Sequence, residues 1–151
     1  WTVGAQAVEI EYDPTKFTYR LLKAITVLDA GKVINHKTSR GLIMGGVNMG
    51  FGIATREAFE YDEDATLQTT TLRTYKPMRF GENPEYVVDF IETPQIDAPF
   101  GARGFAEHGI IAIPAAFANA MSHAADYEFD KLPITPEAIW KAKTGGQYDT
   151  L

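Results

Sequence analysis

The chain opens with a pattern typical of β-strands. Residues 3–12 end in strict alternation of apolar and polar positions, which indicates a strand with one buried face. Residues 13–16 have the composition of a turn, with a proline at its favoured position. Residues 17–28 have the pattern of a second strand, and Asp29-Ala30-Gly31 ends it. The sequence therefore predicts a β-hairpin over residues 3–28 with a four-residue connection.

Helical spacing replaces this alternation after Asn35. Apolar residues recur at helical spacing as far as Glu57, and Asn35 is a suitable N-cap. The predicted helix contains five glycines, each of which destabilises a helix by about 1 kcal/mol relative to alanine. These are Gly41, Gly45, Gly46, Gly50 and Gly52. Two interpretations stay open: the glycines let a neighbouring element pack closely, or they let a bulky cofactor approach.

The glycine pattern does not match the common nucleotide-binding motifs. The segment lacks the lysine and the serine or threonine of a P-loop. It also lacks the strand–turn–helix order of a dinucleotide-binding fold, so both classes are rejected. The acidic run at residues 60–64 does not have the spacing of a calcium loop, and we interpret it as a solvated loop.

The second half of the chain predicts two more strands and two more helices. Residues 69–75 are rich in β-formers, and residues 85–92 form another predicted strand. We expect a helix from Glu107 to about Ala125, kinked near Pro114. The last predicted helix covers residues 137–143, with Thr135 as its N-cap and Pro136 at its first position.

This order of elements is typical of an α+β fold. Strand, strand, helix, strand, strand, helix and helix follow one another, which favours two layers with helices packed on a mixed or antiparallel sheet. We expect one domain over residues 1–143 and a flexible, glycine-containing tail over residues 144–151. The chain begins directly on a strand without an initiator methionine, so we expect it to be a piece of a longer polypeptide.

Composition limits the classes of function. The 151 residues are 45% apolar and 23% charged, as in ordinary globular domains, and no apolar run approaches membrane-spanning length. The net charge of −6 and the lack of a basic stripe argue against nucleic acid as a partner. The absence of cysteine excludes disulfides and thiolate or iron–sulfur ligation within this chain. Without cysteine or an export signal, we expect the cytoplasm.

One acidic residue is the strongest candidate for chemistry. Glu107 ends a glycine-rich loop that begins at Gly101, immediately before an apolar helix. Desolvation in such a place raises a carboxyl pKa and makes the group a usable base. The alternative is a structural acid in the first turn of a helix, where a negative charge favours the dipole. The three histidines have no metal-ligand spacing, so we expect no metal ligands in this chain.

Five segments in order resemble the C-terminal part of the molybdopterin-binding large subunit of the xanthine dehydrogenase/aldehyde oxidase family. Together they cover nearly the whole chain. They are Val8 to Pro14 with Asp29-Ala-Gly-Lys-Val-Ile-Asn35, the glycine-rich stretch Gly41 to Gly52, Thr74-Tyr-Lys-Pro77, Gly101 to Glu107 with Ala118-Asn-Ala-Met121, and Leu132-Pro-Ile-Thr-Pro-Glu137.

The resemblance implies a fold, a reaction and a set of site residues. Glu107 takes the place of the family's catalytic base. Cofactor contacts fall on Gly41, Leu42, Gly45, Gly46, Gly104, Phe105 and Ala106. The implied reaction is hydroxylation of an aldehyde or an aromatic N-heterocycle, such as a xanthine- or hypoxanthine-like purine, with oxygen from water.

The resemblance also implies cofactors and partners. The cofactor is molybdopterin, either in its simple form or as the cytosine dinucleotide. Electrons leave through [2Fe-2S] clusters to FAD on partner subunits or domains, so the partners are the rest of the large subunit and the iron–sulfur and FAD subunits. The fragment alone is expected to be inactive.

The sequence departs from the family pattern at the candidate site. Family members usually carry glutamine at the positions of Leu42 and Met49, and neither residue here can donate a hydrogen bond from its side chain. Ala106 replaces a usual glycine, and His108-Gly109 replaces a usual Pro-Pro. A degenerate subunit that binds partner chains without molybdenum therefore stays open as the alternative, as does an unrelated ligand-binding α+β domain.

Overall fold

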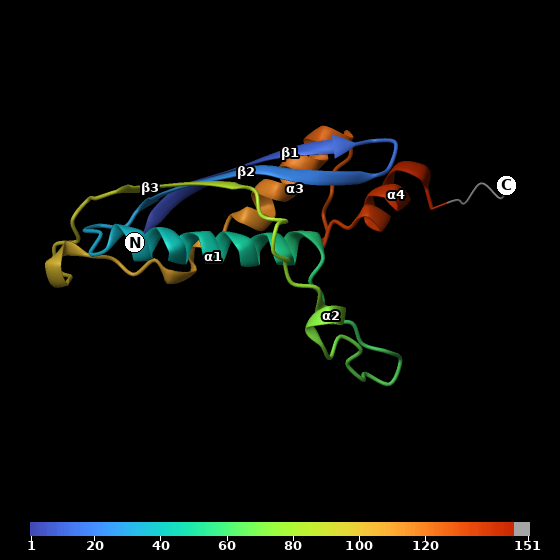
Figure 1. Ribbon diagram of the computed structural model, residues 1–151, viewed down its shortest axis with the longest axis horizontal. Helices are drawn as coiled ribbons and strands as arrows, with labels where there is room; N and C mark the ends of the chain where they lie inside the picture. The colour runs from blue at the N-terminus through green and yellow to red at the C-terminus, as the bar shows by residue number, and fades with distance from the viewer. Residues whose placement is uncertain (147–151) are drawn as a thin grey trace.

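The computed structural model describes residues 1–146, and it contains one mixed sheet with helices on one side (Figure 1). The elements follow in chain order, with η marking 3₁₀ turns. They are β1 (Val3–Asp13), β2 (Thr18–Asp29), α1 (His36–Thr55), α2 (Leu72–Tyr75), β3 (Glu85–Ile91), η1 (Pro99–Gly101), η2 (Ala106–Gly109), α3 (Ile113–Ala125) and α4 (Pro136–Thr144). This architecture confirms the predicted α+β class.

The sheet has the strand order β1-β2-β3. β1 and β2 pair antiparallel and form the predicted hairpin, with a register shift between Glu9 and Ile10. Asp13 stabilises the turn because its Oδ1 accepts the N–H of Thr15 at 2.9 Å and that of Lys16 at 3.2 Å. β3 runs parallel to β2, so the chain must cross over between them, and α1 lies in that crossover.

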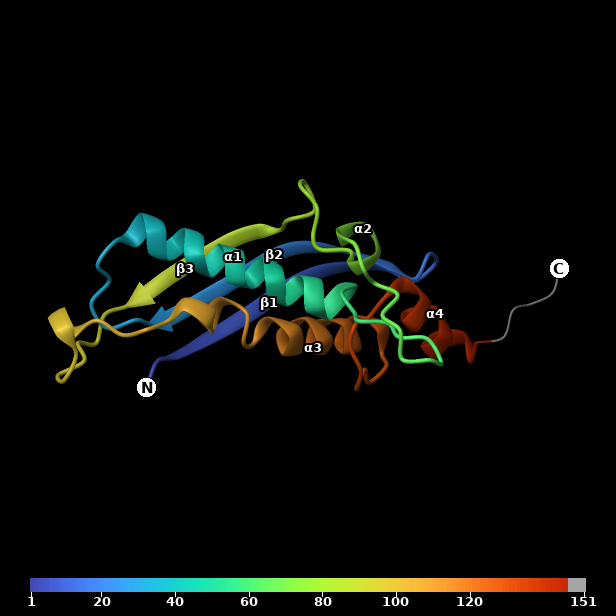
Figure 2. The same cartoon turned by 90° about the horizontal axis from the view of Figure 1, so that it is seen from below.

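Helices α1 and α3 cover the same face of the sheet (Figures 1 and 2). Phe51 of α1 and Phe117 of α3 are fully buried and meet edge to face, with ring centroids 6.4 Å apart. α4 closes the hairpin end, where the Tyr19 hydroxyl donates to the carbonyl of Ile134 at 3.0 Å. The buried core residues are Ala24, Leu28, Ile43, Val47, Phe51, Ala54, Val88, Ile113, Phe117, Met121, Ile134 and Ile139.

The first helix begins as the sequence predicts. The side chain of Asn35 caps α1 by accepting the N–H of Thr38 at 3.1 Å, which satisfies one of the free donors of the first turn. No helix within residues 1–146 is long and apolar enough to cross a membrane.

The glycines of α1 separate into a packed set and an open set. A Cβ on Gly46 would lie 2.9 Å from Cα of Gly109, and one on Gly50 would lie 2.8 Å from Cβ of Ile113. At Gly41 and Gly45, no described atom beyond the adjoining residues and the backbone of the helix itself lies within 4 Å of the same position. Gly46 and Gly50 therefore allow η2 and α3 to approach the helix, while Gly41 and Gly45 lie on an uncovered face.

The predicted strand over residues 69–75 is wrong. Residues 72–75 form the short helix α2, and Thr71 and Thr74 make a capping box. The Thr71 hydroxyl accepts the N–H of Thr74 at 3.3 Å, and the Thr74 hydroxyl accepts the N–H of Thr71 at 3.1 Å. These reciprocal bonds favour a helical turn, and no strand within the described residues pairs with the segment.

The predicted helix from Glu107 is also wrong in its start and in its kink. The chain forms the 3₁₀ turn η2, bends, and begins α3 only at Ile113. Pro114 lies in the first turn of α3, where its missing N–H breaks no helical hydrogen bond. The final helix and its Thr135 cap agree with the prediction. The predicted tail starts inside α4 at Thr144, and residues 147–151 lie outside the described residues.

Alanine substitutions at the adjacent residues Gly45 and Gly46 test whether the first lies open and the second is packed. Gly45→Ala should raise the free energy of unfolding by up to about 1 kcal/mol, because alanine is the better helix former and nothing crowds the new methyl group. Gly46→Ala should lower it by about 1–3 kcal/mol, because the methyl group meets backbone atoms of Gly109. Denaturant unfolding measures both. Equal stability of the two variants would contradict the close contact.

Candidate functional site

Glu107 lies on η2, which packs directly against α1. Gly109, the last residue of η2, is buried, and a Cβ at that position would lie 2.5 Å from the carbonyl oxygen of Ile43. Gly109 and Gly46 thus face each other with no side chain between them. The side chain of Glu107, two residues earlier, is exposed. The candidate base is therefore presented at the surface, at the edge of the first helix.

Gln6 of β1 holds the segment that follows Glu107. Its Nε2 donates to Oγ1 of Thr26 and to the carbonyl of Gly109, both at 2.9 Å. Its Oε1 accepts the N–H of Ala112 at 2.9 Å. One side chain thus fixes the end of η2 and the approach to α3. Sequence reasoning missed this residue, although a glutamine among the inward positions of an alternating strand is a detectable signal.

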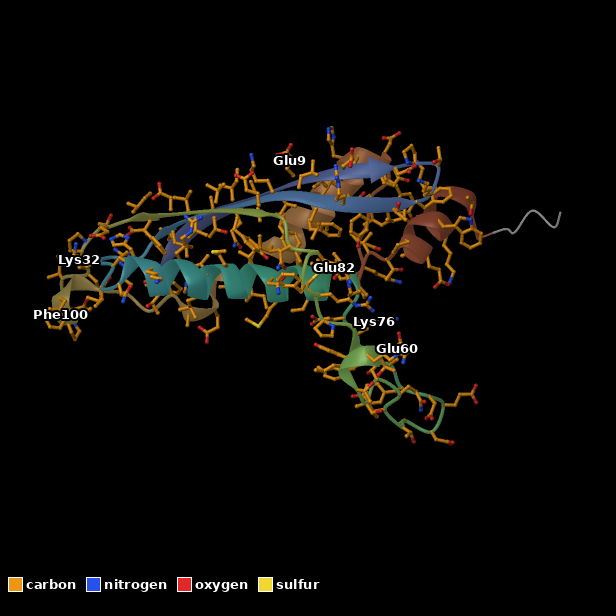
Figure 3. The ribbon with its side chains drawn as sticks, in the orientation of Figure 1. Glu9, Lys32, Glu60, Lys76, Glu82 and Phe100 are labelled. Atoms are coloured by element: carbon orange, nitrogen blue, oxygen red, sulfur yellow. The ribbon has the colours of Figure 1, made fainter. Side chains whose placement is uncertain are left out.

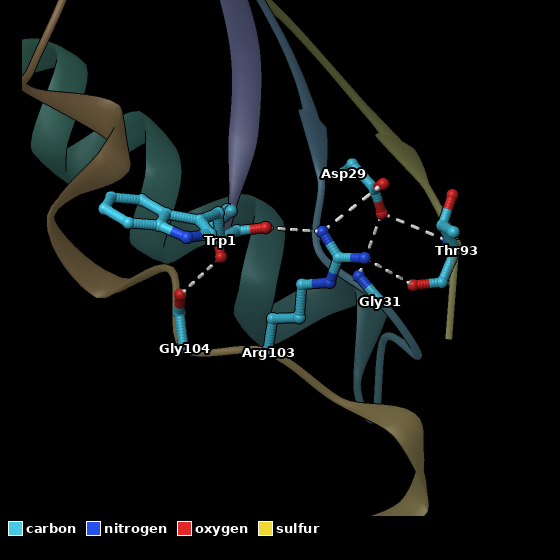
Figure 4. A network of polar contacts seen from close by, with 7 residues as sticks. Trp1, Asp29, Gly31, Thr93, Arg103 and Gly104 are labelled. Atoms are coloured by element: carbon cyan, nitrogen blue, oxygen red, sulfur yellow. Dashed lines mark hydrogen bonds and ion pairs between the residues drawn. The ribbon is translucent and has the colours of Figure 1, made fainter. Parts of the chain in front are cut away.

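Arg103 ties the loop before Glu107 to the ends of the sheet (Figure 4). Its guanidinium donates to the carbonyl of Trp1 at 2.6 Å and to that of Thr93 at 3.1 Å. The same group pairs with Oδ2 of Asp29 at 3.5 Å, and both side chains are mostly buried. The backbone N–H of Arg103 donates to the carbonyl of Ala30 at 3.0 Å. The start of β1 and the ends of β2 and β3 therefore meet at one arginine.

Asp29 is the acceptor at the centre of this network. Its Oδ1 accepts the N–H of Thr93 at 3.1 Å and that of Gly31 at 3.2 Å. The N–H of Thr93 has the largest effect on this carboxylate, and it holds the pKa of Asp29 below its usual value. The N–H of Gly31 and the Arg103 guanidinium lower the pKa further. The sequence identified Asp29 only as the end of a strand and as part of a family motif, because its partners lie far along the chain.

The open face of α1 forms the second part of the candidate site. Gly41 and Gly45 are exposed, and they lie beside Leu42 and Met49, whose side chains are 46% and 56% exposed. Gly45 directly precedes Gly46, which touches η2, so this face adjoins the turn that carries Glu107. Nothing in residues 1–146 covers the two open glycines at their Cβ positions.

The remaining predicted cofactor residues differ in exposure. Gly104 and Ala106 are exposed, and Gly104 has open space at its Cβ position. Phe105 is half-buried, and its ring lies 5.8 Å from that of Phe90. Gly46 is buried against Gly109, so its contact in this structure is with the protein backbone. The cofactor contacts of all these residues stay predictions.

The histidines do not form a metal centre in the described part of the chain. His36 pairs with Glu92 at 3.3 Å, far along the sequence from His108 and His123. No group of three or more histidine, aspartate or glutamate side chains in residues 1–146 is arranged to hold a metal ion.

Protonation of the Asp29 carboxylate at low pH should destabilise the folded protein. Because the pKa of Asp29 is lowered in the folded protein, its charge stabilises the fold above the ordinary value of 3.8, and this stabilisation is lost as the pH falls through the lower folded pKa. Asp29→Asn should therefore unfold at a lower temperature than the wild type at pH 7, and the difference should shrink below about pH 3.8. Thermal unfolding over pH 2–7 measures this, with the exposed Glu9→Gln as control. A difference independent of pH would contradict it.

Comparisons with known proteins identify the family of the chain. Residues 1–84 match the family model of the molybdopterin cofactor-binding domain. The chain is 41% identical to the 6-hydroxypseudooxynicotine dehydrogenase complex subunit gamma and 34% identical to the nicotine 6-hydroxylase large subunit, both of Paenarthrobacter nicotinovorans. Each match covers 94% of this chain and 18% of the relative.

Solved structures show the same fold. Quinoline 2-oxidoreductase from Pseudomonas putida 86 superposes with a TM-score of 0.85 at 31% identity, over 92% of this chain and 18% of that one. The Cu,Mo-CO dehydrogenase superposes with a TM-score of 0.88 at 21% identity, which shows the fold alone. The chain therefore spans about 18% of the length of these relatives, and it belongs to the molybdopterin cofactor-binding domain family of the molybdenum hydroxylase large subunits.

Proposed function

We propose that this chain supplies the general base and part of the cofactor surface of a molybdenum hydroxylase that hydroxylates an aromatic N-heterocycle with oxygen from water. The observation that carries the proposal is the position of Glu107, an exposed carboxylate on a turn that packs on Gly46 of α1, beside the helix face where Gly41 and Gly45 lie open. A base must reach its substrate, and this position leaves the carboxylate accessible.

The residues present fit molybdopterin. A broad, flat group needs backbone that side chains do not shield, and Gly41, Gly45 and Gly104 offer it. In the proposed site these glycines hold the group, and Leu42 contacts it with an apolar side chain. When bound, molybdopterin supplies the redox-active metal that accepts two electrons from the substrate. The protein positions the cofactor and supplies a proton acceptor, Glu107.

The chain's own residues then perform two tasks. Glu107 takes the proton from the water-derived oxygen nucleophile, which leaves that oxygen able to attack the electron-poor carbon next to a ring nitrogen. Gln6 and Arg103 keep the turn and its loop in place by hydrogen bonds of 2.6–3.1 Å.

The names of the relatives favour one class of substrate. Nicotine 6-hydroxylase and quinoline 2-oxidoreductase are named for compounds that contain a pyridine ring. We therefore place such a heterocycle ahead of a purine or an aldehyde for this protein. We further propose iron–sulfur and FAD subunits or domains as partners for electron transfer, molybdopterin in its simple form or as the cytosine dinucleotide, and the cytoplasm as the location.

A second candidate is a subunit that keeps the fold but does not bind molybdenum. The observation in its favour is the apolar surface of Leu42 and Met49 at the open helix face, where neither side chain can donate a hydrogen bond. A buried polar group of the cofactor would lack a partner there. Metal content separates this candidate from the first.

Replacement of Glu107 tests the enzyme proposal. In the full-length subunit, assembled with its electron-transfer partners, Glu107→Gln should lower kcat by about two to four orders of magnitude, because glutamine cannot accept the proton. Turnover of nicotine, quinoline, hypoxanthine and an aldehyde is followed with a dye acceptor. Glu9→Gln, an exposed acid of β1, serves as the matched control and should retain full activity.

Molybdenum analysis of the same samples decides between the two candidates. Equal metal content in the wild type and Glu107→Gln, with turnover lost only in the variant, supports the role of the base. A wild-type protein that contains no molybdenum would support the non-catalytic subunit. Full activity of the metal-loaded Glu107→Gln variant would exclude Glu107 as the base.

A further inference from the structure

A separate arm, residues 57–83, projects from the end of α1 away from the two layers (Figure 1). It contains α2 and the loop before it. No residue from 57 to 77 belongs to the hydrophobic core, and Met78 only packs at its margin. The hydrophobic core therefore contributes little to the stability of the arm.

The arm is nevertheless ordered by its own hydrogen bonds. Asp62 organises the tip, where its carboxylate accepts the N–H groups of Asp64 and Thr66 at 3.0 and 2.9 Å and the side chain of Gln68 at 2.7 Å. At its base, Arg56 pairs with Glu82 at 2.9 Å. This network gives the arm a defined shape without a core of its own.

An apolar groove lies on this arm between Phe59 and α2. Threonines 69–71, Leu72 and Tyr75 complete its walls. The rings of Phe59 and Tyr75 lie 5.3 Å apart, yet the side chains of Phe59 and Leu72 are 65% and 75% exposed. A contiguous apolar surface held open in this way is typical of a binding site for another polypeptide.

Acidic residues surround the tip beside the groove. Residues 57–72 contain five acidic residues and no lysine or arginine. Figure 3 shows Glu60 and Lys76 close to each other beside α2. Within residues 1–146, none of the carboxylates of Glu60, Asp62, Glu63 and Asp64 forms an ion pair. The tip therefore offers uncompensated negative charge to a basic partner.

We propose that this arm docks onto the remainder of the large subunit, at a surface where an aliphatic or aromatic side chain is surrounded by lysine or arginine. The apolar side chain fills the groove, and the basic residues meet the acidic tip. The relatives carry this segment within polypeptides of which the chain spans only 18%, so the partner surface has ample chain to come from. A second copy is a poor occupant, because the chain carries a net charge of −6.

This proposal rests on family membership and is independent of the role of Glu107. Docking of the arm would fix the end of α1, the helix whose open face forms the candidate cofactor surface. Loss of docking would therefore appear first in the stability of the subunit, whereas failure of the proposed chemistry would appear in turnover with the subunit intact. The two outcomes are distinguishable in the same preparation.

A photo-cross-linker placed in the groove identifies the occupant. Benzoylphenylalanine is introduced at Leu72 of the full-length large subunit in its complex, and the irradiated product is mapped by mass spectrometry. We expect a cross-link to a peptide of the same polypeptide outside residues 1–151, flanked by lysine or arginine. A cross-link to another subunit or to a second copy would overturn the proposal, and so would the absence of any cross-link.

Charge reversal at the tip provides a second readout. The double substitution Glu63→Lys with Asp64→Lys should lower the melting temperature of the full-length subunit, because it brings basic side chains against a basic surface. Glu9→Lys, an exposed acid on β1, is the matched control and should leave the melting temperature unchanged. Equal melting temperatures for the double variant and the wild type would show that the tip faces solvent, contrary to the proposal.

Discussion

The contact between Gly46 and Gly109 is the constraint on which the candidate site depends. Two residues without side chains let a 3₁₀ turn lie directly on the backbone of a helix. The position of Glu107 follows from this contact, because only two residues separate it from Gly109. Any side chain at either glycine would move the turn outward and displace the carboxylate from the helix face that adjoins it.

Helix α1 thus carries glycines both on the face that packs against the rest of the protein and on the face that lies open. The inward glycines of α1 replace side-chain packing by backbone contact, and Phe51 and Phe117 supply the buried apolar area around them. The outward glycines lie unshielded where side chains would otherwise cover the helix. A helix with so many glycines is intrinsically weak, so its stability comes from tertiary packing and from the Asn35 cap.

The sequence predicted those features that arise from local patterns. The hairpin, α1 and the Thr135 cap follow from alternation, helical spacing and capping residues close in sequence. Residues 69–75 were assigned wrongly because two threonines that favour strands by composition here form a capping box. The site was only partly visible for a related reason: the Gln6–Gly109 and Arg103–Trp1 bonds join residues more than 100 positions apart, and no local pattern records them.

Arg103 couples the loop that leads to Glu107 to the ends of the three strands. Its guanidinium and backbone N–H together join the start of β1, the end of β2 and the residues just after β3. Opening of the loop that leads to Glu107 would therefore break contacts to three strand ends, which couples local unfolding of the loop to fraying of the sheet. The loop that leads to Glu107 is thus ordered by the protein's own contacts, so a cofactor that bound beside it would not have to supply the free energy to order it.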